Sequence, residues 1–225
     1  MKSNTSMFGS MLWNLFLVML CRVSLLAALT FALPAGAADS PAPPPANTVT
    51  NKPDVVFVPT PQVVVDKMLE MAAIKPGDVV YDLGCGDGRI VVTAAKRYGV
   101  KGVGFDIDPQ RIKDSLANVR SNKVEHLVSI QQKDIFKLDL SEATVVCLYL
   151  LPSLNVRLMP QLEKLRPGSR ILSHDFDMEG AKPLQIVKIP PENGTADEDD
   201  LETHEHTIYK WVVPWEKART APSLP

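Results

Sequence analysis

The segment from Val79 to Arg89 constrains the fold of this 225-residue chain more than any other. A short run of apolar and β-branched residues leads directly into three glycines at alternate positions, Gly84, Gly86 and Gly88, and a helical pattern follows. Glycines in such a turn let the backbone reverse sharply and let a ligand come close to it. The free N–H groups at the start of the next helix can bind a carboxylate or a phosphate. The segment predicts a strand–turn–helix unit with a ligand site, although a strand–helix turn without a ligand has the same composition.

Three acidic residues follow successive predicted strands. Asp82 opens the glycine loop, Asp106 ends the next strand about twenty residues later, and Asp134 follows the third strand. Because the carboxyl ends of parallel strands meet at one edge of a sheet, these carboxylates are expected to line one crevice. Asp106 is placed to accept hydrogen bonds from both hydroxyls of a ribose, and Asp134 from an adenine amino group. The glycine spacing differs by one residue from the G-x-G-x-x-G fingerprint of dinucleotide-binding proteins.

Strand-like and helix-like patterns alternate through most of the chain. The predicted strands are Val79–Asp82, Lys101–Asp106, Leu127–Gln131, Thr144–Tyr149 and Arg170–Phe176, and the predicted helices are Ile90–Tyr98, Pro109–Asn122 and Leu154–Leu165. Two further strands, Gln185–Ile189 and Thr207–Val213, have no helix between them and are expected to pair antiparallel. This order predicts an α/β fold: a mostly parallel seven-stranded sheet with helices on both faces and a terminal antiparallel hairpin.

One amphipathic helix precedes the first strand. Thr60 is a good N-cap residue, Pro61 would occupy the first helical position, and apolar residues follow at helical spacing before Pro76. We expect this helix to open the folded domain, which spans residues 57–215.

The charge balance argues against one class of partner. The chain carries 24 lysines and arginines against 26 aspartates and glutamates, a formal net charge of −2. Nucleic-acid-binding proteins usually carry a surplus of basic residues on one face. We therefore expect no nucleic acid partner.

The glycine loop and the acids that follow the strands resemble those of the class I S-adenosylmethionine-dependent methyltransferases, over residues Thr60 to Val213. The resemblance implies a Rossmann-like fold and S-adenosylmethionine as cofactor. The residues that it assigns to the cofactor are Asp82, Gly84, Gly86 and Gly88 for the methionine moiety, Asp106 for the ribose, and Ile107, Asp134 and Ile135 for the adenine.

A narrower resemblance covers more of the chain. The segments that carry it are Phe57–Pro61, Asp87–Ile90, Asp134–Phe136, Thr144–Leu154 and Pro167–His174. They are similar to a branch that includes the mitochondrial lysine methyltransferases acting on adenine nucleotide translocase and on the ATP synthase c-subunit, together with bacterial relatives. The resemblance implies a protein lysine as methyl acceptor. A small-molecule methyltransferase and a non-catalytic module that binds S-adenosylmethionine or a nucleotide remain alternatives.

Methyl transfer to lysine requires that the ammonium lose a proton, which desolvation and a nearby proton acceptor would assist. The candidate catalytic residues are Tyr149 at the end of the fourth strand and His174 or Asp175 on the fifth. Each is equally well explained as a residue that forms hydrogen bonds at the sheet edge. The sequence from Tyr149 to Ser153 lacks the Asn/Asp-Pro-Pro-Tyr type of motif that methylation of bases or glutamine uses, which argues against those acceptors.

Two further patterns lie near the last strand. His204 and His206 share one strand face, as metal ligands can, but the sequence indicates no third ligand, so we assign no metal. The acidic run Asp197–Asp200 could steer a lysine-rich substrate, and a solvated loop explains it as well.

The N-terminal region differs in character from the domain. The sequence is apolar from Met11 to Leu33, apart from Arg22, and small residues follow at 35–38. This predicts a signal peptide over residues 1–38, with an uncleaved membrane anchor as the alternative. A Pro/Ala-rich linker over residues 39–56 and a flexible tail over 216–225 complete the organisation. We expect an exported protein, periplasmic or secreted, with a membrane-anchored or organellar one as the alternative; membrane contact is expected only through an uncleaved N-terminal segment. An exported enzyme would need S-adenosylmethionine, which is made in the cytosol, to reach it.

Overall fold

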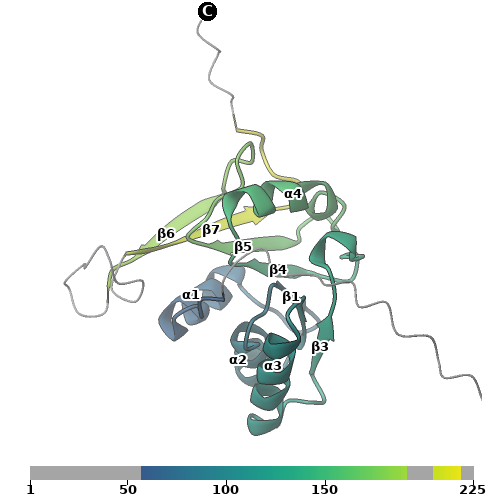
Figure 1. Cartoon of the computed structure of the whole chain (residues 1–225). Coiled ribbons are helices and arrows are strands. Elements are labelled where there is room, and N and C mark those ends of the chain that lie inside the picture. Colours follow the sequence, from purple (N-terminus) through teal and green to yellow (C-terminus); the bar gives the residue numbers. More distant parts are fainter. Residues whose placement is uncertain (1–56, 192–204, 219–225) are drawn as a thin grey trace, which may run out of the picture. The chain divides into compact units, whose positions relative to one another are not determined.

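The seven predicted strands form one sheet in the computed structural model, which describes residues 57–191 and 205–218 (Figure 1). Their spatial order is β3-β2-β1-β4-β5-β7-β6. The strands are β1 (Val79–Leu83), β2 (Lys101–Asp106), β3 (Val128–Gln132), β4 (Val145–Leu148), β5 (Arg170–His174), β6 (Gln185–Ile189) and β7 (His206–Val212). Strands β1 to β5 pair parallel, and β7 is antiparallel to both β5 and β6. The predicted mostly parallel sheet with a terminal antiparallel hairpin is confirmed.

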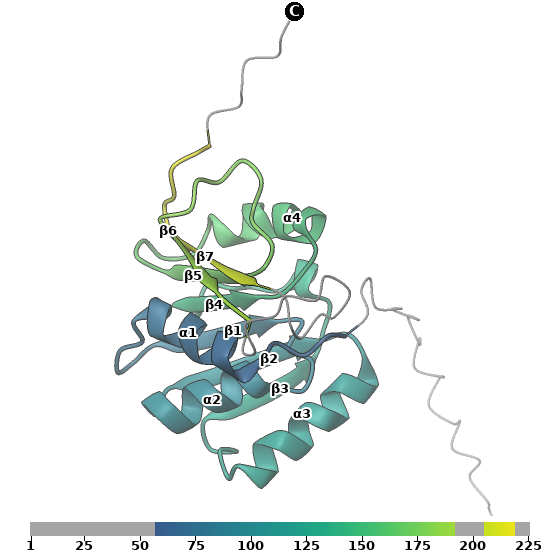
Figure 2. The ribbon, with the colours of Figure 1, turned by 90° about the vertical axis from the view of Figure 1, so that its left-hand side faces the viewer.

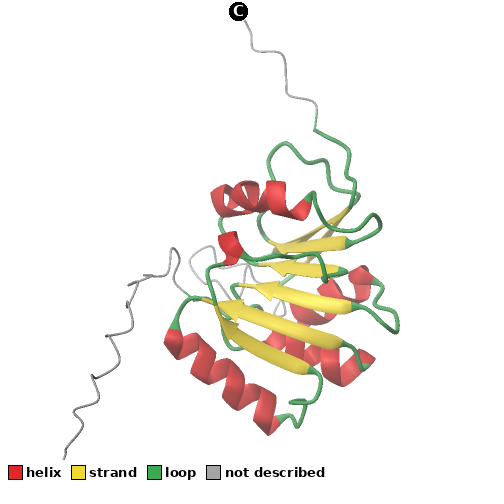
Figure 3. Ribbon diagram, turned by 90° about the vertical axis from the view of Figure 1, so that its right-hand side faces the viewer, coloured by secondary structure: helices red, strands yellow, loops and turns green. Residues whose placement is uncertain are grey.

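Helices cover both faces of this sheet (Figures 2 and 3). The helices are α1 (Gln62–Ala72), α2 (Arg89–Tyr98), α3 (Pro109–Ser121) and α4 (Pro152–Leu162), and a 3₁₀ turn, η1, spans Ile135–Lys137. Side chains of α1 and α2 share one apolar core with Val80 and Val145, whereas those of α4 share a second core with Tyr81 and Val146. Because consecutive strand residues point to opposite faces, the two cores lie on opposite sides of the sheet.

The central strand β4 shows why a strand in the middle of this sheet consists of consecutive apolar residues. All four of its residues, Val145 to Leu148, are buried, since both faces of a parallel sheet are covered. The strand ends at Leu148, so Tyr149 lies just beyond it; β5 likewise ends at His174, just before Asp175. The chain leaves both strands at the same edge of the sheet, which is the edge that carries the glycine loop.

The predicted cap of α1 is wrong. Pro61, not Thr60, is the N-cap residue, and no side chain caps the helix there. The Oγ1 of Thr60 lies instead 3.3 Å from Nδ1 of His174. Helix α4 also begins two residues before its predicted start, because Pro152 fits the first turn of a helix, where no N–H is needed.

The described residues include only part of the two ends of the chain. Residues 1–56 lie outside the described part, so the signal peptide and the linker stay predictions. Residues 216–218, assigned above to the tail, pair with residues 180–182: the amide of Lys182 donates to the carbonyl of Glu216 at 2.8 Å, and that of Ala218 to Gly180 at 2.9 Å. Within the described residues, no helix has the length and apolar character needed to cross a membrane.

A buried ion pair joins the elements at the other end of the sheet. The carboxylate of Asp78, which precedes β1, binds the guanidinium of Arg170 at the start of β5 and accepts a hydrogen bond from Oγ1 of Thr144 at 2.7 Å. It also accepts the Lys75 amide at 2.7 Å. Nε of Arg170 donates to the carbonyl of Ala72 at 3.0 Å, which attaches the end of α1. These contacts fix the beginnings of β1, β4 and β5 and the end of α1 relative to one another, at the end of the sheet away from the glycine loop.

We predict that Asp78→Ala lowers the free energy of unfolding by about 3–5 kcal/mol at pH 7, because it leaves the largely buried side chain of Arg170, 16% exposed, without its carboxylate partner. Burial alone would raise the pKa of Asp78, but the hydrogen bonds from Arg170, Lys75 and Thr144 outweigh it and lower that pKa. A lowered pKa stabilises the fold above the ordinary carboxyl range, so the loss should shrink as the pH falls below about 4.

Urea unfolding at several pH values measures this difference. Glu125→Ala is the control, because Glu125 is exposed; it should change the free energy by no more than about 0.5 kcal/mol. A loss below about 1 kcal/mol for Asp78→Ala at pH 7 would contradict the structural role of the ion pair.

Candidate functional site

The glycine loop between β1 and α2 is fixed by backbone contacts to β2. The amides of Gly84 and Cys85 both donate to the carbonyl of Phe105 at 2.8 Å. Gly86 and Gly88 have φ angles of 54° and 75°, which non-glycine residues adopt at a cost. A Cβ at Gly86 would lie 2.0 Å from the ring of Phe57. Glycine is therefore required both by the backbone conformation and by the close approach of that ring.

A cavity of about 310 Å³ opens beside this loop, at the carboxyl ends of β1, β2 and β4. The chain runs outward from β1 to β3 and returns to β4 on the other side of β1, so the cavity lies where the strand order reverses. Open α/β sheets bind their ligands at this point. The predicted cofactor residues that line the cavity are Asp82, Gly84, Asp106, Ile107, Asp134 and Ile135. Gly86 and Gly88 are not among the lining residues and serve the shape of the loop instead.

Asp106 ends β2 and braces the loop. Its Oδ2 accepts the Gly86 amide at 2.9 Å, and its Oδ1 accepts the Asp108 amide at 2.9 Å. Each carboxylate oxygen has a second lone pair, so both can still accept a ligand hydroxyl. The geometry is compatible with the predicted role of holding a ribose.

Asp82 is a carboxyl group buried in the wall of the cavity, with 3% of its surface exposed. Burial, followed by the charges of Asp106 and Asp87, raises its pKa to about 8. A cationic group of a ligand placed beside it would favour the ionised carboxylate. Without such a group, the carboxyl of Asp82 is mostly protonated at neutral pH.

Asp134 caps the 3₁₀ turn at another wall of the cavity. Its Oδ1 accepts the Phe136 amide at 3.0 Å. The hydrogen bond from Lys137 is the largest influence on its pKa and lowers it, so the side chain is an ionised acceptor. The guanidinium of Arg157 lies 3.7 Å above the ring of Phe136 and helps to fix the turn.

Residues before α1 form a wall that the sequence motifs did not assign. Arg89 binds the Asp87 carboxylate through two nitrogens, at 3.0 Å from Nε to Oδ1 and 2.6 Å from Nη2 to Oδ2, and its Nη1 donates to the Thr60 carbonyl at 2.7 Å. The ring of Phe57 packs over Gly86, with the guanidinium of Arg111 4.7 Å from its centroid. The segment 57–60 is thereby held against the glycine loop. The Phe57–Pro61 motif was visible in the sequence, but its position over the loop was not.

The three catalytic candidates have different positions. Tyr149 lines the cavity, and its ring centroid lies 3.9 Å from that of His174 and 6.0 Å from that of Phe176. His174 is fully buried behind Tyr149, and neither it nor Asp175 lines the cavity. Burial, and then the charge of Asp175, raises the pKa of Tyr149, so its phenol stays protonated at neutral pH.

Asp175 belongs to a buried cluster with His174 and His206. Although burial raises the pKa of Asp175, hydrogen bonds from His174, the Thr207 amide and His206 outweigh it and hold that pKa below its usual range. The acidic run Asp197–Asp200 and His204 lie outside the described residues, whereas His206 is the first residue of β7.

Comparisons with known proteins agree with this site. A family model described as the ANTKMT methyltransferase domain matches residues 82–185. A protein-lysine N-methyltransferase of Saccharolobus islandicus is 45% identical over 163 residues, which cover 72% of this chain and 95% of that protein. A lysine N-methyltransferase of the ATP synthase c-subunit, from Xenopus laevis, is 30% identical over 135 residues, 58% of this chain and 57% of that protein.

A solved structure is also similar. An RNA methyltransferase of Salinibacter ruber, crystallised with S-adenosyl-L-homocysteine, is 46% identical and has a TM-score of 0.61; the match covers 74% of this chain and 97% of that one. S-adenosyl-L-homocysteine is the product that remains when S-adenosylmethionine gives up its methyl group.

We predict that Asp106→Ala weakens binding of S-adenosylmethionine by about ten- to hundredfold, because it removes a charged acceptor for the ribose hydroxyls. Isothermal titration calorimetry measures the affinity, and Glu125→Ala, which changes an exposed acid, should leave it unchanged. Unaltered affinity of Asp106→Ala would show that the ribose lies elsewhere.

We predict a pH-dependent effect for Asp82→Asn in the ligand-free protein. A carboxyl whose pKa is raised from its ordinary value to about 8 loses its contribution to stability as the pH rises between about 4 and 8. The variant has no such group. The difference between its free energy of unfolding and that of the unaltered protein should therefore increase over that range and stay constant above it. Urea unfolding at pH 5, 7 and 9 tests this, and a difference independent of pH would contradict it.

Proposed function

The chain belongs to the family of S-adenosylmethionine-dependent methyltransferases that carry the ANTKMT methyltransferase domain, and we propose that it methylates the side-chain amine of a lysine in a protein. The observation that carries this proposal is the 45% identity to a protein-lysine N-methyltransferase over 95% of that protein's length. The identity to a lysine N-methyltransferase of the ATP synthase c-subunit supports the same acceptor class.

S-adenosylmethionine supplies an activated methyl group, so the protein has mainly to hold the acceptor in line and to exclude water. In our proposal, the glycine loop with Asp82 holds the methionine moiety and Asp106 the ribose. Ile107, Asp134 and Ile135 hold the adenine. The positions of these groups around one cavity support this assignment.

The wall of the cavity that follows β4 suits a lysine side chain. Leu150, Leu151 and Leu154 line it together with Tyr149, and Phe176, which follows β5, lines the cavity beside Tyr149. An apolar environment favours the neutral amine over the ammonium, and the neutral amine is the form that accepts a methyl group. The Tyr149 hydroxyl is the proposed hydrogen-bonding group for that amine, and His174 and Asp175 act through Tyr149 as positioning residues.

The size of the cavity favours a macromolecular acceptor over a small molecule. Its volume of about 310 Å³ lies at the lower end of the range for ligand pockets, about 300–1,000 Å³. In our proposal, a single cofactor occupies this space. The acceptor must then reach the methyl group from outside, as one extended side chain of a larger molecule can.

RNA is a second candidate acceptor, because the similar structure from Salinibacter ruber is described as an RNA methyltransferase. Two features favour lysine. The chain has a formal net charge of −2, and the segment after β4 lacks the motif typical of base methylation. A non-catalytic binding module is the third candidate, and it would transfer no methyl group.

We also infer from the sequence of residues 1–38 that the protein is exported with a cleaved signal peptide. Mass spectrometry of the N-terminus of the native protein tests this inference. A peptide that retains residues before Leu33 on the mature protein would contradict cleavage.

Transfer of tritiated methyl from S-adenosylmethionine into extracts of the source cell tests the acceptor class. We expect label in macromolecules that protease releases and ribonuclease does not. Release by ribonuclease would identify RNA as acceptor, label in small molecules would identify a small acceptor, and no transfer at all would support the non-catalytic module; each contradicts the proposal.

We predict that Tyr149→Phe lowers kcat by about a hundredfold, because it removes the hydrogen-bonding hydroxyl while the aromatic wall remains. The affinity for S-adenosylmethionine should stay within about twofold. Tyr98→Phe at the end of α2 is the matched control and should change neither quantity. Full activity of Tyr149→Phe in the transfer assay would exclude the hydroxyl from the reaction.

A further inference from the structure

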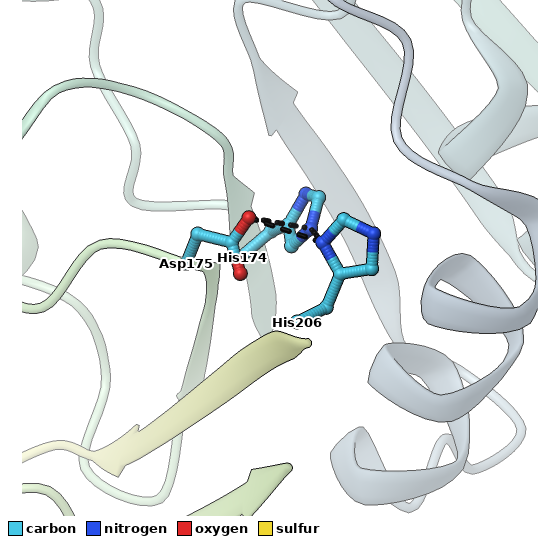
Figure 4. Close-up of side chains that lie close together, drawn as sticks. All are labelled: His174, Asp175 and His206. Carbon is cyan, nitrogen blue, oxygen red and sulfur yellow. Dashed lines mark hydrogen bonds and ion pairs between the residues drawn. The ribbon is translucent and has the colours of Figure 1, made fainter. Parts of the chain in front are cut away.

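Three side chains meet where β5 ends and β7 begins (Figure 4). His174 is the last residue of β5, Asp175 follows it, and His206 is the first residue of β7. The side chains are 0%, 15% and 5% exposed, respectively. The cluster lies behind Tyr149 and outside the lining of the cofactor cavity.

One atom of each side chain lies close to one atom of each of the other two. Nε2 of His174 lies 2.9 Å from Nδ1 of His206 and 3.2 Å from Oδ2 of Asp175, and the last two atoms are 3.1 Å apart. The three atoms form a nearly equilateral triangle. Ligand atoms about 2.0–2.2 Å from one metal ion are separated by about 2.8–3.1 Å when they are adjacent in octahedral geometry and by about 3.3–3.6 Å in tetrahedral geometry, so the triangle lies closer to the octahedral range.

Protons alone account for this triangle less well than a cation does. Each nitrogen can direct at most one N–H into the triangle, and an N–H points at only one acceptor with good geometry. Protons therefore satisfy at most two of the three contacts among these atoms. A single cation at the centre satisfies all three.

The backbone at Asp175 brings its carboxylate to the same side as His174. Consecutive residues of an extended strand point to opposite faces, which would separate these two side chains. Asp175 instead has a φ of 56°, a left-handed conformation that is uncommon for a non-glycine residue. Such conformations cluster at ligand-binding positions.

His174 and Asp175 also have partners outside the triangle. Nδ1 of His174 lies 3.3 Å from Oγ1 of Thr60, and Oδ1 of Asp175 accepts the Thr207 amide at 2.8 Å. Metal-binding histidines and carboxylates are usually oriented by such contacts through their remaining atoms. The outer partner of His174 explains why Thr60 turns away from the helix that it was predicted to cap.

We propose that His174, Asp175 and His206 bind one divalent first-row transition-metal ion, for which Zn²⁺ is the probe. Two imidazoles and one carboxylate suit Zn²⁺, Fe²⁺, Co²⁺ or Mn²⁺ better than Ca²⁺ or Mg²⁺, which prefer oxygen ligands throughout. The ion ties the end of β5 to the start of β7 and supports the ring of Tyr149 from behind. The sequence did not reveal this set, because His206 lies more than thirty residues from the other two ligands.

Metal analysis of the full chain tests the proposal without any measurement of methyl transfer. The protein is stripped with a chelator, titrated with Zn²⁺ in a calorimeter and analysed by plasma mass spectrometry after dialysis. We expect one equivalent of Zn²⁺ per chain, and a thermal unfolding midpoint that rises with Zn²⁺ concentration. With Co²⁺ in place of Zn²⁺, we expect visible absorption bands of a bound ion.

Substitutions of the proposed ligands test where the ion binds. Asp175→Asn keeps a residue that tolerates the left-handed conformation, and His206→Ala removes an imidazole; each should weaken Zn²⁺ binding at least about tenfold. His126→Ala is the control, since His126 is exposed in the turn after α3, and it should bind Zn²⁺ unchanged. Circular dichroism shows which variants fold, and Asp175→Asn carries the test if His206→Ala does not. The absence of Zn²⁺ binding, or binding that Asp175→Asn leaves intact, would overturn the proposal.

Discussion

The attachment of the glycine loop to the end of β2 determines the rest of the site. Two loop amides donate to the Phe105 carbonyl, and the Gly86 amide donates to the Asp106 carboxylate. These contacts set where α2 begins, and Arg89 on its first turn then holds the segment 57–60 by the Thr60 carbonyl. The position of one wall of the cavity therefore depends on the contacts of the glycine loop.

The two ends of β1 show how the same residue type serves stability and ligand binding. Asp78 before the strand has Arg170 as its partner, and its pKa is lowered. Asp82 within the strand is buried near other carboxylates, and its pKa is raised to about 8. Strand β1 thus has a paired carboxylate at one end and, at the end that lines the cavity, a buried carboxyl whose pKa is raised.

Local sequence patterns predicted the helices and strands well, but they could not predict contacts between residues that are far apart in the sequence. The bounds of β2 and β6 were predicted to the residue, because short runs rich in apolar and β-branched residues between turn residues mark strands. Asp106 and Asp134 were found because strand ends share one edge. The contact of Phe57 with Gly86 and the meeting of His174 with His206 depend on packing and on the pairing of β5 with β7, which no local spacing encodes. For the same reason Thr60 was predicted as a cap, whereas its hydroxyl contacts a histidine 114 residues away.

In our proposal, this cavity delivers a methyl group to the side-chain nitrogen of a protein lysine. Mapping of the methylated site in the product tests this acceptor: the labelled protein is purified after reaction, digested and sequenced by tandem mass spectrometry. We predict that the added methyl groups reside on lysine Nζ. Methyl groups found on another type of side chain, on the peptide N-terminus or on a nucleotide would contradict lysine as the acceptor.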